Sequence, residues 1–370
     1  MDKKAIIIDP FNNYEIRSKY VKNCLEGLGY ETIIVSSNFS HNKKTYVEKS
    51  NADDVVFIDT PAYFKNLSYK RIKSHRVFAR RVYGYVANER PDLIYCILPP
   101  NSLAKYMAKY QRANGGCRVF FDVLDLWPES LPAPSGIKKA LFAWKNLRNK
   151  NLKIARKVIT ECSLYKKYLP QNISSETIYL CKRRQVTDFH LEWDVINFVY
   201  VGSINNIIDI DGIVELLSRI NKRRTVNLHI IGGGEATEKF LSSASSAELN
   251  VINHGTIYDE QIKTEIISTC HFGINMYKSG LCIGLTMKSL DYFSRGLPIV
   301  TNNIFDTAQI VEKYGCGYVL DGNSVSDVEN AISTITYEKW SEMKDNVVNT
   351  YDNLFSTDTV VDKLTEVLGI

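Results

Sequence analysis

Short apolar runs alternate along the whole chain with longer segments whose apolar residues recur every three or four positions. The short runs are rich in Val and Ile and predict β-strands, at residues 5–8, 32–35, 55–58, 93–98, 119–123, 158–160, 177–180, 197–201, 227–231, 251–254, 273–276, 298–301 and 317–320. The longer segments predict amphipathic helices, at residues 16–28, 69–89, 103–114, 137–156, 213–221, 236–247, 259–268, 287–294, 307–314 and 325–335. This alternation predicts parallel sheets covered by helices on both faces.

The length of the chain predicts more than one domain. Its 370 residues exceed the roughly 250–300 that a single hydrophobic core supports. Residues 181–194 follow no clear period, so we expect a linker there. The predicted architecture is α/β, with two Rossmann-like domains that face a central cleft, at residues 1–185 and 186–350. In the final segment, residues 351–370, a helix near 360–367 is free to pack back on the first domain.

The net charge of +5 is the sum of two unequal halves. Residues 1–190 hold 33 Lys and Arg against 17 Asp and Glu, a net +16, whereas residues 191–370 hold 13 against 24, a net −11. The basic half predicts an anionic partner. Its charge is densest in residues 65–83 and 138–157, where it interleaves with apolar residues. Such faces favour an anionic membrane surface; a solvated helix face is the alternative, and no nucleic-acid partner is expected because no such motif is present.

Nothing near the N-terminus resembles a targeting segment. The apolar residues 5–8 are too few for a signal-peptide core, and no stretch approaches the ~20 apolar residues of a membrane span. The eight cysteines form no CxxC pair and match no histidine spacing, so we expect no metal site. Scattered thiols are typical of a reducing compartment. We therefore expect a cytoplasmic protein that binds peripherally to the inner face of the cell membrane.

The six histidines form no ligand pair at helical spacing. His41, His75 and His190 stand among polar residues, whereas His254 and His271 lie in or beside predicted strands. We therefore expect structural rather than catalytic histidines.

Residues 284–300 form the strongest motif of the second half. Thr286 is placed to cap a short helix and Gly296 to end it. The start of a helix offers N–H groups to a phosphate. Lys288 stands in the first turn, where the helix dipole disfavours a cation, and this favours a ligand-binding role. Asp291, one turn further, is suited to binding a ribose diol, with an ion pair to Lys288 as the alternative.

Two further segments are candidate ligand sites. Gly232, Gly233 and Gly234 follow a predicted strand and would let backbone amides approach an anion, although the full GxGxxG spacing is absent and a simple turn is the alternative. Residues 121–130 begin at the end of another predicted strand and include the acids Asp122, Asp125 and Glu129. We expect these carboxylates at the edge of the cleft, where they would bind hydroxyl groups of the acceptor or donor or act as a base. Trp127, in the same segment, either stacks on a sugar ring or fills the gap between domains.

Residues 288–300, Lys-Ser-Leu-Asp-Tyr-Phe-Ser-Arg-Gly-Leu-Pro-Ile-Val, resemble the Lys…Glu-Tyr-Met-Ala…Gly-x-Pro-Val-Ile segment of family 4 glycosyltransferases. Residues 121–130, Phe-Asp-Val-Leu-Asp-Leu-Trp-Pro-Glu-Ser, resemble the Asp-x-x-Asp-Leu-Trp-Pro-Glu segment of capsule and O-antigen members. Residues 200–203, 230–235 and 255–257 follow in the family order. The likeness runs from about Asp9 to Val319, and the two quoted motifs are its specific part.

The resemblance implies a GT-B fold and a retaining, metal-independent hexosyltransferase. The donor would be a UDP- or GDP-sugar bound by the second domain, and the acceptor a lipid-linked molecule or glycan bound by the first, in capsule, O-antigen or exopolysaccharide synthesis. It implies no covalent nucleophile, because the leaving diphosphate assists the acceptor, and no cofactor. The catalytic candidates are Asp122, Asp125 and Lys288. The substrate-binding candidates are Asn12, Asn13, Trp127, Glu129, Gly202, Ser203, Gly232, Gly233, Gly234, Thr256, Ile257, Tyr258, Leu285, Thr286 and Asp291.

The sequence departs from the family pattern at the donor-binding positions. The family usually carries an Arg and a Lys after the first strand of the second domain, whereas residues 202–206 here are Gly-Ser-Ile-Asn-Asn. Of the family's two glutamates eight residues apart, the first is Ile283 and the second Asp291. Lys288, helped by Arg183 or Arg184, would have to bind the diphosphate. A second hypothesis is therefore a non-catalytic subunit that binds a sugar or a partner transferase, and a nucleotide-sugar epimerase is a third, disfavoured one.

Overall fold

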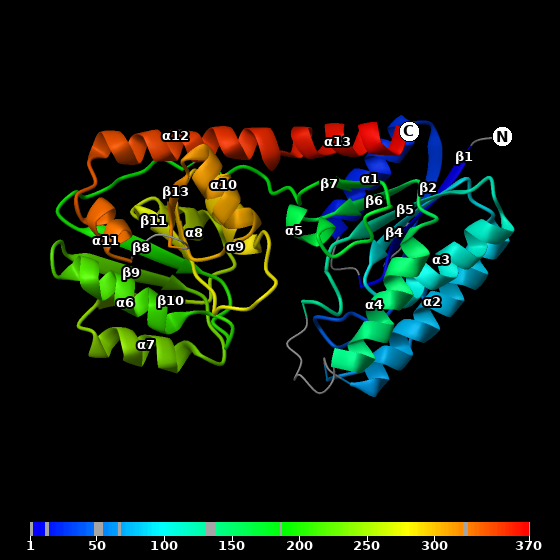
Figure 1. The fold of residues 1–370 in the computed structure, drawn as a ribbon, viewed down its shortest axis with the longest axis horizontal. Helices are drawn as coiled ribbons and strands as arrows, with labels where there is room; N and C mark the ends of the chain where they lie inside the picture. The colour runs from blue at the N-terminus through cyan, green and yellow to red at the C-terminus, as the bar shows by residue number, and fades with distance from the viewer. Residues whose placement is uncertain are drawn as a thin grey trace. The chain divides into compact units, whose positions relative to one another are not determined.

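The computed structural model describes residues 3–11, 15–47, 55–65, 68–130, 138–185, 187–320 and 325–369. The chain divides into two compact units, Met1–Leu180 with Val360–Ile370, and Cys181–Thr359. Each unit is a parallel sheet with helices packed on it (Figure 1). This confirms the predicted α/β class with two Rossmann-like domains.

The first domain is built on a seven-stranded sheet in the order β3-β2-β1-β4-β5-β6-β7, with neighbouring strands parallel. Its strands are β1 (Lys3–Asp9), β2 (Tyr30–Ser37), β3 (Val55–Ile58), β4 (Leu93–Leu98), β5 (Arg118–Val123), β6 (Lys157–Thr160) and β7 (Ser175–Thr177). Strand β4 is buried at every position, as expected for a sheet covered on both faces. The strand order reverses between β1 and β4, and ligands in such sheets bind beyond the carboxyl ends near that reversal.

The helices of the first domain include one from the end of the chain. They are α1 (Glu15–Gly27), α2 (Tyr69–Glu89), α3 (Asn101–Ala113), α4 (Lys138–Leu152), the short α5 (Ser163–Lys166) and α13 (Thr357–Gly369). Helices α2, α3 and α4 pack side by side (Figure 1). Helix α13 returns to this domain, where the Cys24 thiol contacts the Val361 carbonyl oxygen at 3.7 Å. Its buried side chains are Val360, Leu364, Val367 and Leu368.

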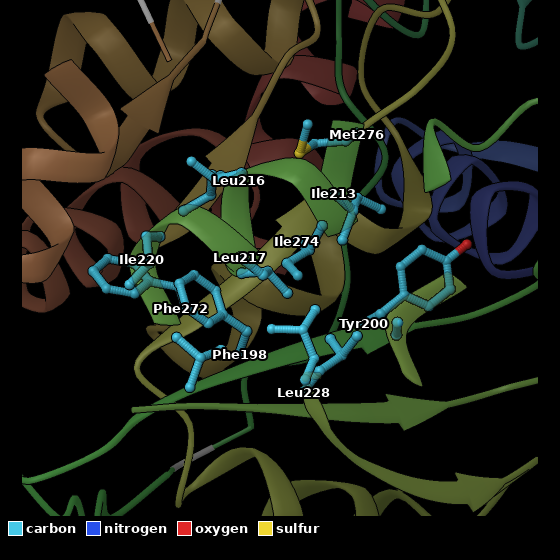
Figure 2. Close-up of a cluster of buried hydrophobic side chains, with 14 of the residues drawn as sticks. Phe198, Tyr200, Ile213, Leu216, Leu217, Ile220, Leu228, Phe272, Ile274 and Met276 are labelled. Atoms are coloured by element: carbon cyan, nitrogen blue, oxygen red, sulfur yellow. The ribbon is translucent and has the colours of Figure 1, made fainter. Parts of the chain in front are cut away.

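The second domain has a six-stranded parallel sheet in the order β10-β9-β8-β11-β12-β13. Its strands are β8 (Ile196–Val201), β9 (Val226–Ile231), β10 (Asn250–Gly255), β11 (Phe272–Asn275), β12 (Ile299–Thr301) and β13 (Gly317–Val319). Its helices are α6 (Ile210–Asn221), α7 (Thr237–Ser246), α8 (Glu260–Ile267), α9 (Met287–Arg295), α10 (Asp306–Tyr314), α11 (Val325–Ser333) and α12 (Tyr337–Leu354). Figure 2 shows the core, in which side chains of α6 meet those of β8, β9 and β11, including Ile213, Leu217, Phe198, Leu228 and Phe272.

The structure differs from the predicted elements in three places. Strand β7 covers residues 175–177 rather than 177–180. It ends there because Thr177 pairs with Thr160, which is the last residue of the neighbouring strand β6. Helix α5 is a single turn that the pattern does not predict. The pattern does not predict the long helix α12 either, because its segment is mostly polar and only a single row of apolar residues packs on the domain. That row is Trp340, Met343, Val347 and Tyr351.

Candidate functional site

In the second domain, the loops that follow β8 and β9 cross with their backbones in direct contact. A Cβ added to Gly232 would lie 2.0 Å from the Gly202 carbonyl oxygen, and one added to Gly234 would lie 2.3 Å from that of Ile204. Gly232 and Gly234 have φ values of 148° and 159°, which residues with a Cβ rarely adopt. The Ile204 N–H donates to the Gly233 carbonyl oxygen at 3.1 Å. The crossing therefore requires glycine, and it presents backbone at the carboxyl edge of the sheet.

Lys288 reaches this crossing from the first turn of α9. A Cβ added to Gly202 would lie 3.1 Å from its Cε. Its ammonium group donates to the Tyr200 hydroxyl and lies 4.1 Å from the centre of the Tyr200 ring and 5.2 Å from that of Tyr277. The Tyr200 hydroxyl donates in turn to the Ser203 carbonyl oxygen at 2.7 Å. Burial lowers the pKa of Lys288 to about 7, because desolvation disfavours the charged form.

Side-chain hydroxyl and amide groups hold the start of α9 in place. Thr286 caps the helix by accepting a hydrogen bond from the Ser289 N–H at 3.0 Å, and the Ser289 hydroxyl accepts one from the Asn275 side-chain amide at 2.6 Å. Gly296 ends the helix in the left-handed conformation, so both predicted helix ends are confirmed. The first-turn N–H groups of a helix have no acceptor within it, and they add a partial positive charge near Lys288.

Asp291 does not pair with Lys288. Its carboxylate pairs with Lys182 from the expected linker and with Arg295 at 3.1 Å, and Glu260 joins the cluster through Arg295. The Arg295 side chain is fully buried. A ribose diol that bound Asp291 would therefore compete with two cations for the same carboxylate.

The other predicted donor-binding residues fall at the same edge of the sheet or close to it. Thr256, Ile257 and Tyr258 follow β10; Thr256 is exposed, and so is the Tyr258 ring. Leu285 is buried before the start of α9. The structure brings together Gly202, Ser203, Gly232, Gly233, Gly234, Thr256 and Lys288.

A cavity of about 650 Å³ opens beyond β11 and β12 in the same domain. Tyr277, which faces the Lys288 ammonium group, contributes to its lining. Ile283 also lines it, at the position where the resemblance places a carboxylate. The cavity therefore lies beside the glycine crossing, and its wall is less acidic than the family pattern implies.

In the first domain, Asp122 lies inside β5 and is completely buried. Its carboxylate accepts hydrogen bonds from the Arg17 guanidinium at 2.9 Å and from the Tyr95 hydroxyl. Arg17 also donates to the carbonyl oxygens of Ile178 and Tyr179, both at 3.3 Å. This corrects the expectation that Asp122 stands at the edge of a cleft, because its side chain points into the layer between sheet and helix. Its geometry is that of a structural ion pair joining α1, β4 and β5.

Asp125 and Trp127 lie in the turn that follows β5. The Ser130 hydroxyl donates to the Asp125 carboxylate at 2.6 Å, and burial raises the pKa of Asp125. Trp127 is only 6% exposed. The Arg71 guanidinium lies 4.2 Å from its ring centre and the His75 ring stacks on it at 5.8 Å. The indole is thus covered by its own domain and is no open platform for a sugar ring.

Glu129 forms the clearest structural ion pair of this segment. It receives two hydrogen bonds from Arg148 at 2.9 and 3.0 Å, and Lys145 lies 3.2 Å away. The Arg148 side chain is fully buried and also donates to the Trp127 carbonyl oxygen at 2.8 Å. Two cations of the basic segment 138–157, Lys145 and Arg148, are therefore paired within the domain, so they do not belong to the basic face that the charge count predicts for a membrane surface.

Of four further residues expected near the substrate, two lie outside the described residues and two are exposed in the segment before β8. Asn12 and Asn13 lie outside the described residues. Arg184 donates to the Asp352 carboxylate on α12 at 2.9 and 3.0 Å, whereas Arg183 is exposed. Arg184 is therefore held by an acid of its own domain rather than at the glycine crossing.

Helix α2 turns two of its basic residues inward, which the charge pattern of residues 65–83 does not predict. Arg71 is 8% exposed and His75 is 5% exposed, which corrects the expectation that His75 stands in polar surroundings. Both share the spacing of the buried Phe78 and Val82, so helical periodicity alone would have placed them on the inner face. The outer face carries the exposed cations Lys70, Lys73, Arg76 and Arg80.

The described part of the chain has neither a metal-binding cluster nor a membrane-spanning helix. It contains no group of three or more His, Cys, Asp or Glu side chains able to hold a metal ion. Within the same ranges, no helix has both the length and the apolar character needed to span a membrane.

Comparisons with known proteins give a family match for the second domain and a shared fold for the whole chain. Residues 196–337, which include the glycine crossing and Lys288, match the family described as Glycosyl transferases group 1. No curated protein sequence matches the chain. Among solved structures, the sucrose-phosphate synthase of Thermosynechococcus elongatus superposes with a TM-score of 0.72 at 14% identity, over 99% of this chain and 98% of that one.

Two further structures match over the same extent. The lipopolysaccharide outer core galactosyltransferase WaaB has a TM-score of 0.69 at 15% identity, and HepE of Anabaena, solved with UDP and glucose, has 0.67 at 12%; each covers 99% of both chains. At these identities the likeness shows the fold, which is GT-B. The family match of the second domain and the GT-B fold of the whole chain together support a glycosyltransferase.

Proposed function

We propose that this protein is a retaining glycosyltransferase that moves a sugar from a nucleotide-sugar donor to a lipid-linked or glycan acceptor. The observation that carries the proposal is the half-buried Lys288 ammonium group beside the Gly202 and Gly232 crossing, inside the segment that matches group 1 glycosyltransferases. HepE, which shares the fold, is solved with UDP-glucose. A UDP- or GDP-linked hexose is accordingly the donor we propose.

We assign each part of the donor to a group of residues in the second domain. Lys288, the α9 N-terminus and the backbone of the crossing would bind the diphosphate. Asp291 would bind the ribose, and the backbone near Thr256 the base. The sugar would enter the cavity lined by Tyr277 and Ile283. Transfer would need no covalent nucleophile and no metal ion, because the leaving diphosphate, neutralised by Lys288, assists the acceptor.

We propose that the first domain binds the acceptor and the inner face of the cell membrane, in synthesis of a cell-surface polysaccharide such as capsule, O-antigen or exopolysaccharide. The support is its excess of positive charge together with the outer face of α2, which carries exposed cations and exposed apolar side chains. On this helix Tyr69 is 74% exposed and Ile72 is 36% exposed, and Phe64, in the segment before it, is 69% exposed. Such a face suits an anionic bilayer.

A second candidate function is a non-catalytic subunit that binds a sugar or a partner transferase. Two observations favour it. Ile283 stands where a carboxylate would contact the donor sugar, and Asp291 is already held by Lys182 and Arg295.

The decisive experiment incubates the purified protein with anionic liposomes and a panel of nucleotide sugars, and measures transfer and donor hydrolysis. Consumption of one donor, undiminished by EDTA, supports the enzyme, and NMR of the product tests retention at the anomeric carbon. Calorimetry with UDP and GDP separates the candidates: a protein that binds neither nucleotide and consumes no donor is the non-catalytic subunit.

A further inference from the structure

Five aromatic rings converge at the carboxyl edge of the first sheet. They come from the segments after β1, β2, β3 and β5 and from the first turns of α2. The His75 ring lies at the centre, with ring centroids 5.0 Å from Phe11 and 5.8 Å from both Tyr63 and Trp127. His41 closes the group, and its Nδ1 lies 2.7 Å from the Tyr63 hydroxyl. We call these rings, with the side chains of Lys44 and Arg71, the basic aromatic cage.

The cage concentrates positive charge. The Arg71 guanidinium lies 4.2 Å from the Trp127 ring centre and 5.8 Å from that of Tyr63. The Lys44 ammonium group lies 4.9 Å from the Tyr63 ring centre and 3.4 Å from His41 Nδ1. Burial and then the charge of Arg71 lower the pKa of Lys44, and the same causes, with Lys44 added, lower the pKa of His41 to about 4. Burial is the main cause of both shifts and the neighbouring positive charge adds to it, so a bound anion would favour the protonated forms of these groups.

His75 gives an independent indication of a ligand. It is 95% buried, and neither of its ring nitrogens has a hydrogen-bond partner among the described residues. A buried polar group without a partner costs free energy, which a ligand oxygen beside the ring would recover. The unpartnered ring nitrogens of His75 therefore lie inside the basic aromatic cage. The cage itself stands at the carboxyl edge of the sheet, which is where ligands bind in doubly wound folds.

An apolar cavity of about 460 Å³ adjoins the cage between α2, α3 and α4. His75 lines this cavity as well as the cage. The other lining residues are mostly apolar and include Ile72, Pro100, Leu141, Trp144 and Leu147. A ligand that filled both sites would join an anionic group to an apolar one.

We propose that the basic aromatic cage binds a phosphate or diphosphate group of the acceptor, and that the adjoining cavity holds the apolar chain bonded to it. The inference rests on the proposed function only in assigning the acceptor to the first domain. Lys44 lies in the loop after β2 and Arg71 in the first turn of α2, so the two cations approach from different elements. A phosphate offers acceptor oxygens in several directions, which suits this arrangement better than a planar carboxylate.

The test measures binding of farnesyl diphosphate to the full chain by calorimetry, with UDP present at saturation to occupy the donor site. We expect Lys44→Gln to weaken farnesyl diphosphate about tenfold, the loss of one charge-assisted hydrogen bond. Lys43→Gln is the matched control, because Lys43 is the exposed neighbour of Lys44. The Lys43 variant should bind farnesyl diphosphate as tightly as the wild type does. Arg71→Lys should retain part of the affinity. Equal losses in the Lys43 and Lys44 variants would overturn the proposal, because they would show non-specific charge attraction.

A second variant separates a lipid phosphate from a soluble one. Ala143→Trp, at an exposed position that lines the cavity, should weaken farnesyl diphosphate and leave inorganic diphosphate unchanged. If glucose 6-phosphate or inorganic diphosphate binds as tightly as farnesyl diphosphate, the apolar half of the assignment is wrong. Farnesyl diphosphate binding is also measured without UDP. A protein that binds farnesyl diphosphate but no nucleotide would contradict the proposed transferase and still support the cage.

Discussion

Lys288 is the residue whose ionisation we expect to control nucleotide binding. Burial lowers its pKa to about 7, whereas a bound diphosphate would stabilise the ammonium form and raise that pKa. Tyr200 and Tyr277, which face it, remain neutral near pH 7 because burial raises the pKa of both phenols. Above pH 7 the free lysine must therefore take up a proton when the nucleotide binds.

We accordingly expect the Kd for UDP to rise with pH, by up to about tenfold per unit between about pH 7 and pH 9. The UDP phosphates are already ionised there, since a terminal phosphate titrates near pH ~6. Lys288→Ala should bind UDP at least about tenfold more weakly at pH 7 and lose the pH dependence, while uridine affinity stays unchanged. Calorimetry across this range checks the prediction, and a wild-type Kd that is independent of pH would contradict it.

Asp122 should matter for stability rather than for catalysis. Asp122→Ala leaves the buried Arg17 guanidinium without its carboxylate, and breaking a buried ion pair in this way costs about 3–5 kcal/mol. Urea denaturation should show that loss in the free energy of unfolding. Asp125→Asn, in the half-buried turn nearby, is the comparison and should cost much less. A stable Asp122→Ala protein without transferase activity would restore the catalytic assignment.

These two residues show how far single positions could be predicted from sequence. Lys288 stood out because a cation in the first turn of a helix opposes the local dipole, a conflict visible within a few residues. Asp122 was misplaced because its partner, Arg17, lies 105 residues away. Only folding decides whether an acid near the end of a strand meets solvent or a buried cation.

At the scale of elements, α2 carries two different basic faces. Its inner residues, Arg71 and His75, belong to the cage, whereas its outer cations are exposed. A count of charge predicts residues 65–83 as one basic surface, because it does not assign each residue to a face of the helix. The helical period separates the two faces, since Arg71, His75, Phe78 and Val82 follow one another at spacings of four, three and four.

Reversing the charge of the outer face only, with Lys70→Glu, Lys73→Glu and Arg80→Glu together, should release the protein from anionic liposomes. Each basic residue near such a surface contributes about 1 kcal/mol, so the triple variant should bind at least about a hundredfold more weakly in cosedimentation. UDP affinity should be unchanged.

A matched control reverses three exposed cations of the second domain, Lys222, Lys278 and Lys313, which changes the net charge equally. This control should still bind liposomes. Equal release of both variants would show that net charge, rather than the α2 face, determines membrane binding.

At the scale of the whole molecule, the end of the chain completes the first domain. Residues Val360–Ile370 belong to that unit although the second domain precedes them, and Val360, Leu364 and Leu368 are almost fully buried. Deleting residues 360–370 removes several buried side chains that contribute about 1.5–3 kcal/mol each.

We expect this deletion to unfold the first domain while the second still binds UDP. Scanning calorimetry should then lose the transition of the first domain, and UDP should continue to raise the Tm of the remaining one. Leu364→Ala is a milder variant that should cost about 2–5 kcal/mol. Loss of both transitions in the deletion variant would show that the two domains unfold as one unit.

The sequence alone determined the fold class, most helices and strands, and the start and end of α9, because each depends on spacings within one segment. It also indicated Lys288 and the glycines of the crossing. Only the tertiary structure decided the partners of Asp122, Glu129 and Asp291, and the assembly of the basic aromatic cage. The physical reason is that burial and ion pairing join residues from distant segments, and those contacts exist only when the sheet has brought its loops together.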